Sequence, residues 1–218
     1  MSQLIFKFPF KTKYYEQDFY VSSNNFSAYR LIENWPNWPG KWLNIFGSPG
    51  SGKTHLSKIL EKKIKSILII DENKIEDEFV QKLDNYKCLI IDNFKSRIGE
   101  KLFYAILNQS KQLDSFVLIN SALPLSKNDF KLQDLKSRLD SFINIGIDLP
   151  TDELLKVIIS KSFSEKQIFL DPKITDYIIK NVERSYSKIF KFLKDIDDMS
   201  LSSGKSININ LIKKVLNQ

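Results

Sequence analysis

The pattern of apolar positions divides the sequence into two regions. Between residues 41 and 147, five short apolar runs alternate with helical stretches; the runs are 41–46, 66–70, 88–91, 115–119 and 142–147. Their near-continuous Ile, Leu, Val and Phe content is typical of strands that are covered on both faces. Upstream of them, residues 23–34 are typical of a helix that begins at a Ser or Asn cap. We therefore expect an α/β fold with a parallel sheet and helices on both of its faces.

The pattern changes after Leu149-Pro150. Four helical stretches separated by caps or breakers follow, at 151–166, 171–182, 185–203 and 208–217. The sequence therefore predicts three parts: an aromatic and basic tail at residues 1–13, an α/β domain at residues 14–149 and a small all-helical domain at residues 150–218.

Composition excludes several classes of protein. With 42% apolar and 12% aromatic residues, the chain can bury a sizeable core and is not expected to be disordered. Its single cysteine, Cys88, cannot form an intramolecular disulfide, which suits a reducing compartment. No apolar run is long enough for a membrane span, and the start lacks the features of a secretion signal. We expect a cytoplasmic protein without a membrane partner.

The net charge of +7 is a weak indication of nucleic-acid binding. The 33 basic residues comprise 29 lysines and only four arginines, namely Arg30, Arg97, Arg138 and Arg184. Specific readout of bases depends on the planar fork of arginine more than on lysine. Direct DNA binding by this chain alone is therefore not our expectation. The same scarcity directs attention to those positions at which an arginine is present.

The segment Gly47-Ser-Pro-Gly-Ser-Gly-Lys-Thr54 matches the phosphate-binding pattern G-x-x-x-x-G-K-[ST]. It follows a predicted strand and begins a predicted helix at 54–63, which is the context that this loop requires. Glycines allow successive backbone N–H groups to surround phosphate oxygens, Lys53 neutralises the β- and γ-phosphates, and the Thr54 hydroxyl binds Mg²⁺. The residues expected at the nucleotide are Gly47, Gly50, Ser51, Gly52, Lys53, Thr54 and His55.

A phosphate loop of this kind requires a carboxylate at the end of a second buried strand. Asp92 follows the apolar run 88–91 and is our candidate Mg²⁺-side acid, with Asp71 as the alternative. Asn93 follows Asp92 at the position where many P-loop ATPases carry the acid that activates water. An amide can orient water but cannot accept its proton, so we expect slow hydrolysis by this chain alone. Alternatively, Asn93 only caps the turn.

The motifs at 52–56 (Gly-Lys-Thr-His-Leu) and 135–139 (Leu-Lys-Ser-Arg-Leu), together with the helical C-terminal region, resemble the DnaA/Hda family of AAA+ proteins. The sequence is more similar to the short Hda branch, which regulates the replication initiator DnaA, than to the initiator itself. The resemblance extends from Gln3 to the last helix. It implies a P-loop AAA+ sheet followed by a helical lid, with bound ADP or ATP and Mg²⁺.

The resemblance also implies roles for individual residues. Tyr20 and Val21 lie in a stretch similar to the one that approaches the adenine base in this family. Arg138 lies where the family has its arginine finger, which acts in trans. Arg184 lies at the position of the lid arginine that contacts the phosphates, although an exposed helix surface explains it equally well. Asp92-Asn93 is similar to the Asp-Asn pair of the Hda branch.

The sequence departs from the family after the fourth predicted strand. A Ser-Asp-Arg-Pro stretch is common there, whereas this chain has Asn120-Ser-Ala-Leu-Pro124, with Ala122 and Leu123 at the Asp and Arg positions. Asn120 or Ser121 is the candidate replacement for the polar side chain that senses the γ-phosphate. The initiator's DNA-binding domain has no counterpart in this sequence, which also argues against origin recognition.

The N-terminal tail resembles the peptide by which Hda proteins bind the sliding clamp, the β subunit of DNA polymerase III. Gln3 would supply directed hydrogen bonds, while Leu4, Phe6 and Phe8 would fill an apolar pocket. The alternation of apolar residues is equally typical of an edge strand.

These observations predict a negative regulator of replication initiation. It would bind an adenine nucleotide, dock on the clamp and promote hydrolysis of the ATP bound to DnaA; a homo-oligomer is compatible with this role. One alternative is a free-standing P-loop ATPase that loads a helicase or remodels a DNA complex. Another is a clamp- or membrane-associated adaptor that uses nucleotide only structurally.

Overall fold

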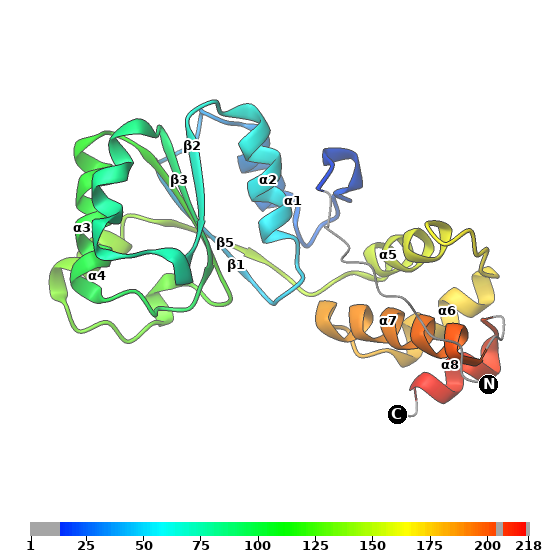
Figure 1. Ribbon diagram of the computed structural model, residues 1–218. Coiled ribbons are helices and arrows are strands. Elements are labelled where there is room, and N and C mark those ends of the chain that lie inside the picture. Colours follow the sequence, from blue (N-terminus) through cyan, green and yellow to red (C-terminus); the bar gives the residue numbers. More distant parts are fainter. Residues whose placement is uncertain (1–13, 204–206, 217–218) are drawn as a thin grey trace. The chain divides into compact units, whose positions relative to one another are not determined.

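The computed structural model describes residues 14–203 and 207–216. They form two compact units, Tyr14–Asp148 and a second unit that begins at Leu149 (Figure 1). Neither Gln3, Leu4, Phe6 and Phe8 nor the edge strand considered for the tail lies within the described residues.

The first unit is built on a five-stranded parallel sheet. Its strands are β1 (Trp42–Gly47), β2 (Ile67–Asp71), β3 (Cys88–Phe94), β4 (Phe116–Ser121) and β5 (Ile143–Ile147). They are arranged in the order β2-β3-β4-β1-β5, and all four neighbouring pairs are parallel. The five predicted apolar runs are these strands, so the predicted α/β fold with a parallel sheet is confirmed.

Helices cover both faces of the sheet. They are α1 (Phe26–Glu33), α2 (Lys53–Lys63), α3 (Glu100–Gln112) and α4 (Gln133–Leu139). Short 3-10 segments lie at Glu16–Asp18, Glu72–Lys74, Asp77–Asn85 and Leu125–Lys127. α1 and α2 pack on one face through residues such as Ile32 and Leu56, whereas α3 and α4 pack on the other through residues such as Phe103 and Leu135 (Figure 1).

The start of α1 refines one expectation. Asn25 occupies the N-cap position, but its side chain makes no capping hydrogen bond to the helix. Instead, its amide donates to the Tyr20 carbonyl at 2.9 Å and its oxygen accepts from the Ser22 backbone N–H at 2.9 Å. The Asn25 side chain therefore stabilises the turn before the helix, in the manner common for Asn in turns.

The second unit is all-helical. It contains α5 (Asp152–Ser164), α6 (Pro172–Asn181), α7 (Tyr186–Ser203) and α8 (Ile209–Leu216), which match the four predicted helical stretches. Thr151 caps α5, and Asp171 caps α6 ahead of its first residue, Pro172. A separate core joins the helices through residues such as Phe163 and Ile189. In the described part of the chain, no helix has the length and apolar character that crossing a bilayer demands.

Candidate functional site

The carboxyl ends of parallel strands lie at one edge of a sheet, and here that edge carries the predicted chemistry. β1 ends at Gly47, where the phosphate loop begins. Asp92 lies late in β3 and Asn120 late in β4. In open α/β sheets this edge is where ligands bind.

The backbone of the phosphate loop requires glycine. Gly50 and Gly52 have φ angles of 85° and 99°, which side chains rarely adopt. A Cβ at Gly52 would also lie 2.8 Å from Cε2 of Phe19, and one at Gly47 would lie 2.8 Å from the Ile147 carbonyl oxygen. α2 begins immediately afterwards, at Lys53, so its N-terminal N–H groups face the loop. The predicted strand–loop–helix context is therefore present.

Lys53 lies over the loop that precedes it. Its amine donates to the carbonyls of Gly47 at 2.7 Å and Ser48 at 3.0 Å, and it lies 3.4 Å from the Ser51 hydroxyl. Burial lowers the pKa of Lys53, and the nearby Asp92 carboxylate opposes that shift. Phosphate oxygens at this position would favour the charged ammonium in the same way as Asp92 does.

The two candidate Mg²⁺ ligands, Thr54 and Asp92, contact each other directly. The Thr54 hydroxyl donates to Oδ2 of Asp92 at 2.8 Å, although 38 residues separate them. The amide of Asn120 donates to the other carboxylate oxygen at 2.9 Å and also contacts the Ser57 hydroxyl at 2.7 Å. Asn120, rather than Ser121, is thus the polar β4 side chain at the Asp92 carboxylate, while the Ser121 hydroxyl donates to the Leu123 carbonyl.

This cluster has the donor set that Mg²⁺ prefers. Among the described residues, no three His, Cys, Asp or Glu side chains gather to hold a metal on their own. Mg²⁺ commonly takes one or two carboxylates and completes its shell with water and substrate phosphates. The side-chain oxygen of Asn120 is buried without a hydrogen-bond partner in the described part of the chain, while its amide nitrogen contacts Asp92. Thr54 and Asp92 therefore fit a Mg²⁺ that is held jointly with a nucleotide.

Asp71 and Asn93 form a different, exposed pair. Asn93 has a φ of 55° and its amide donates to Oδ2 of Asp71 at 2.7 Å. The Asp71 carboxylate also accepts from the backbone and side chain of Asn73. These hydrogen bonds lower the pKa of Asp71, and the bond from Asn93 has the largest effect. Asp71 is thus bound to Asn93, whereas Asp92 is the carboxylate that contacts Thr54.

Glu72 is a buried acid that the sequence did not reveal as a site residue. Its carboxylate accepts backbone N–H groups of Lys95, of Arg97 at 2.6 Å and of Ile98 at 3.2 Å. The side chain is 3% exposed. Glu72 therefore fixes the loop after β3, beside the Asp71–Asn93 pair, and its role is structural.

The segment before α1 lies against the phosphate-loop helix. His55 contacts the Tyr15 carbonyl at 2.7 Å through Nε2, and its ring meets that of Phe19 edge-on at 5.3 Å. His55 thus packs against the segment before α1, and Phe19 contacts the loop at Gly52. The expected contact of His55 with the nucleotide remains a prediction. Tyr20 follows and is 42% exposed. The predicted contacts of Tyr20 and Val21 with adenine remain predictions.

Arg138 lies at the other edge of the sheet. It lines a cavity with Trp42, the first residue of β1, and with Ser115, which directly precedes β4. Its Nε donates to Oδ1 of Asn108 on α3 at 2.9 Å. Because β1 runs five residue steps from Trp42 to Gly47, the two edges are separated by about 17 Å. Arg138 is therefore not part of its own chain's phosphate site.

The second unit holds the other arginine singled out from the sequence. Arg184 forms an ion pair with Asp152, with Nη2 2.9 Å from Oδ1, and both side chains are more than half exposed. Contact of Arg184 with bound phosphates remains a prediction.

Three contacting residues had been missed in the sequence. Ser57 lies one helical turn after Thr54 on the same helix, so its position could have been predicted from the spacing. Asn108 lies 30 residues from Arg138. No local pattern in the sequence links Asn108 to Arg138. The same is true of Asn44 of β1, whose amide donates to the Ile119 carbonyl and the Ser121 hydroxyl on β4.

Residues 152–216 match the family model described as "Hda, lid domain". The chromosomal replication initiator DnaA of Buchnera aphidicola subsp. Cinara cedri is 28% identical over 234 aligned positions, which cover 94% of this chain and 53% of that protein. The chain thus spans about half the length of the curated relatives that it matches.

Solved structures show the same fold. Domain III of Thermotoga maritima DnaA superposes with a TM-score of 0.75 and 20% identity, covering 96% of this chain and 98% of that one. AMPPCP-bound DnaA from Aquifex aeolicus gives a TM-score of 0.68 at 21% identity, covering 86% of this chain and 66% of the other. The lid match, the similarity to the initiator and the shared fold are consistent with a DnaA/Hda-type AAA+ protein.

Proposed function

We propose that the chain is an Hda-like regulator of the replication initiator DnaA. It binds ADP or ATP with Mg²⁺, docks on the sliding clamp and promotes hydrolysis of initiator-bound ATP in the cytoplasm. The observation that carries this proposal is the position of Arg138 at the edge of the sheet opposite its own phosphate loop.

The phosphate loop supports nucleotide binding. Lys53 and the N-terminus of α2 present positive charge to phosphates, and Thr54 with Asp92 would hold Mg²⁺. When bound, the metal would neutralise the charge on the phosphates. A related initiator, DnaA of Aquifex aeolicus, carries the nucleotide analogue AMPPCP.

Hydrolysis by the chain alone is expected to be slow. Asn93 cannot accept a proton, and its amide is bound to Asp71. A protein with this site is better suited to holding a nucleotide than to turning it over rapidly.

Arg138 supplies what a partner requires. An arginine placed in trans at a nucleotide's phosphates accelerates hydrolysis by about 10³–10⁵-fold in other NTPase pairs. Arg138 is half-buried and lies at the amino edge, where a second molecule can approach it without passing the chain's own nucleotide. We propose the DnaA initiator as that second molecule.

The proposed clamp contact rests on sequence alone. Gln3, Leu4, Phe6 and Phe8 have the residue types that suit docking of an extended peptide into an apolar pocket. The clamp would bring the regulator to the initiator on replicated DNA.

One assay tests both parts of the proposal. ATP-loaded DnaA is mixed with the sliding clamp loaded on DNA and with this chain, and phosphate release is followed. The chain is tested as the wild type, without residues 1–8, and as Arg138→Ala. Both variants should lose stimulation, the first because it does not dock and the second because it lacks the finger. A pull-down on the clamp should retain the wild type and Arg138→Ala but not the chain that lacks residues 1–8. Stimulation by both variants, or robust hydrolysis without DnaA, would instead favour a free-standing ATPase.

A further inference from the structure

A β-bulge interrupts β3 where its apolar run ends. Between the pairs that β3 makes with Ile119 and Ser121 of β4, two residues of β3 lie opposite the single residue Asn120. These two are Asp92 and Asn93, and Asn93 has a φ of 55°, a left-handed conformation that Asn adopts more readily than most residues. Bulges change the direction of a side chain and are frequent next to active sites. The bulge therefore sets the direction of the Asn93 side chain, one residue after the candidate Mg²⁺ ligand.

The Asn93 side chain contacts the neighbouring strand. Its amide nitrogen donates to Oδ2 of Asp71 at 2.7 Å, so the hydrogen bond joins β3 to β2. Asp71 is also the register partner of Asp92 in this parallel pair of strands. All three residues therefore lie at the carboxyl edge of the sheet. The contact with Asp71 favours a role for Asn93 other than capping the turn.

The Asp71 carboxylate determines which way the Asn93 amide points. An ionised carboxylate has only acceptor oxygens, so it binds the NH₂ group of Asn93 and not its carbonyl oxygen. The hydrogen bonds to Asp71, that from Asn93 above all, hold the pKa of Asp71 below its ordinary value, so the carboxylate is ionised at neutral pH. The side-chain oxygen of Asn93 is thus directed away from Asp71, and no donor contacts it in the described part of the chain.

Asp71 is itself held in place. Its Oδ1 accepts the backbone N–H of Asn73 at 3.0 Å and the side-chain amide of Asn73 at 2.7 Å. The side-chain oxygen of Asn73 accepts in turn from Nη1 of Arg97 at 3.2 Å. Arg97 lies in the loop after β3, and its backbone N–H donates to the buried Glu72. One of the four arginines of the chain thus completes a continuous set of hydrogen bonds that ends at the Asn93 amide.

We propose that the side-chain oxygen of Asn93 binds the water that attacks the γ-phosphate of ATP held by this chain, and that Asp71 is the positioning residue that keeps the amide in this orientation. This inference rests on the proposed function, because that function supplies ATP at the phosphate loop. It also accounts for slow hydrolysis, because an amide oxygen can orient water but does not take its proton.

The chemical step balances without a base from the protein. The oxygen of the water forms a bond to the γ-phosphorus while the bond from that phosphorus to the β,γ-bridging oxygen breaks, and ADP leaves with the electron pair of the broken bond. The proton that the water loses goes to an oxygen of the released phosphate. In a loose transition state of this kind, positioning makes a large contribution to the rate.

Single-turnover hydrolysis of ATP by the chain alone tests the inference. The chain is in excess over radiolabelled ATP with Mg²⁺, and the variants are Asp71→Ala, Asn93→Ala and the two combined. Asp77→Ala is the matched control, because it removes an exposed acid from the segment that follows β2. The melting temperature shows that each variant is folded. Should Asn93→Ala fail to fold, Asn93→Gly replaces it, since glycine adopts a positive φ readily.

We expect Asp71→Ala and Asn93→Ala each to lower the rate about tenfold or more, since even a small misplacement at the reacting atoms has effects of that size. The combined variant should be no slower than Asn93→Ala, because Asp71 acts through Asn93. Asp77→Ala should match the wild type. A wild-type rate in either single variant, or a wild-type protein no faster than Lys53→Ala, would overturn the inference.

Exchanging the two side chains gives a second test. Asp71→Asn/Asn93→Asp keeps one amide and one carboxylate in contact, but it places the carboxylate at position 93, where it can accept the proton of the water. General-base catalysis of this kind contributes about 10²–10⁴-fold, so the exchanged variant should hydrolyse ATP faster than the wild type. A rate no higher than that of Asn93→Ala would show that position 93 does not face the water, and the inference would fail.

A transition-state analogue gives a readout that does not depend on turnover. Titration calorimetry compares the affinity for ADP with that for ADP plus aluminium fluoride, which imitates the phosphoryl group during transfer. Such analogues bind more tightly than the ground state when the site is complementary to the transition state. The wild type should gain affinity from the fluoride, and Asp71→Ala and Asn93→Ala should lose most of that gain. If both variants keep the full gain, the pair does not position the water.

The outcomes separate this inference from the proposed function. If either single variant hydrolyses ATP at the wild-type rate while the wild type stimulates hydrolysis by DnaA, the inference is wrong and the proposed function stands. If both single variants lose their own hydrolysis while the wild type does not stimulate DnaA, the inference stands and the regulatory function is wrong. If the chain binds no adenine nucleotide, both are wrong.

Discussion

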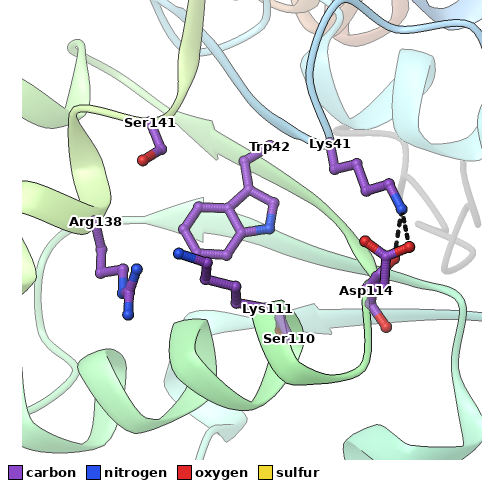
Figure 2. A pocket seen from close by; sticks show the side chains of 8 residues that line it. Lys41, Trp42, Ser110, Lys111, Asp114, Arg138 and Ser141 are labelled. Carbon is purple, nitrogen blue, oxygen red and sulfur yellow. Dashed lines mark hydrogen bonds and ion pairs between the residues drawn. The ribbon is translucent and has the colours of Figure 1, made fainter.

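The two edges of the sheet in the first unit use polar side chains in opposite ways. At the carboxyl edge, Thr54 and Asn120 both donate to the buried Asp92, at 2.8 and 2.9 Å. At the amino edge, Arg138 and Lys111 line an open cavity (Figure 2), and Nε of Arg138 donates to Oδ1 of Asn108 at 2.9 Å. Charge is compensated within the chain at the first edge and is left available at the second.

This difference separates two kinds of binding. A site that encloses its own ligand benefits from groups that are already held in place, because little ordering remains to be done on binding. A site that acts on a partner must keep its charge accessible until the partner arrives. The same sheet thus carries an inward-facing candidate nucleotide site and an outward-facing cationic one, and variants at one edge should leave the other edge unaffected.

The largest expected effect is at the phosphate loop. Lys53→Ala removes the ammonium that would contact bound phosphates, and charge-assisted hydrogen bonds of this type contribute about 1.5–3 kcal/mol each. We expect the affinity for ADP with Mg²⁺ to fall on the order of 100-fold, measured by titration calorimetry.

Two matched variants sharpen that result. Lys58→Ala removes a lysine of the same helix that is paired with Glu61, and Arg138→Ala removes the cation at the other edge. Both should bind ADP within about twofold of the wild type. A large loss with Arg138→Ala would show that the two edges do not act separately.

A smaller effect is expected for Asn120→Ala. The change removes the donor shared by Ser57 and Asp92 and leaves the buried Asp92 carboxylate with one contact fewer. Loss of such a partner costs about 1–3 kcal/mol in the free energy of unfolding, which urea denaturation at neutral pH would measure.

Asn144→Ala is the control for that change. Asn144 is an exposed residue of β5 whose amide donates to the Phe142 carbonyl, so its removal should cost less than about 0.5 kcal/mol. Equal destabilisation by the two variants would contradict the view that the carboxyl edge is the tightly bonded one.

The smallest effect concerns the exposed Asp71–Asn93 pair. Asn93→Ala removes the hydrogen bond that does most to hold the pKa of Asp71 below its ordinary value of 3.8. We expect the pKa of Asp71 to rise toward that value in a pH titration of the side-chain carbonyl by NMR.

The sign of the linked effect on stability follows. The carboxylate of Asp71 is favoured in the folded state, so its contribution is complete above pH 3.8 and is lost as the pH falls through the lower, folded pKa. The wild type should therefore lose stability relative to Asn93→Ala in that acid range. A pKa of Asp71 that is the same in both proteins would show that Asn93 is not its main partner.

The sequence predicted those features that depend on neighbouring residues. The glycines, Lys53 and Thr54 lie in one continuous segment, and Asp92 follows an apolar run, so motif and strand pattern were sufficient. The interaction of Asn93 with Asp71 was not predictable, because it depends on β2 lying next to β3 in the sheet. Similarly, the contact of Asn108 with Arg138 depends on the packing of α3 beside α4.

The segment before α1 packs directly against the phosphate loop and α2. Tyr15 is attached to His55 on α2, and Phe19 lies so close to Gly52 that a methyl group there would collide with its ring. A force applied to the chain at residue 14 would therefore act on the phosphate loop within a few residues.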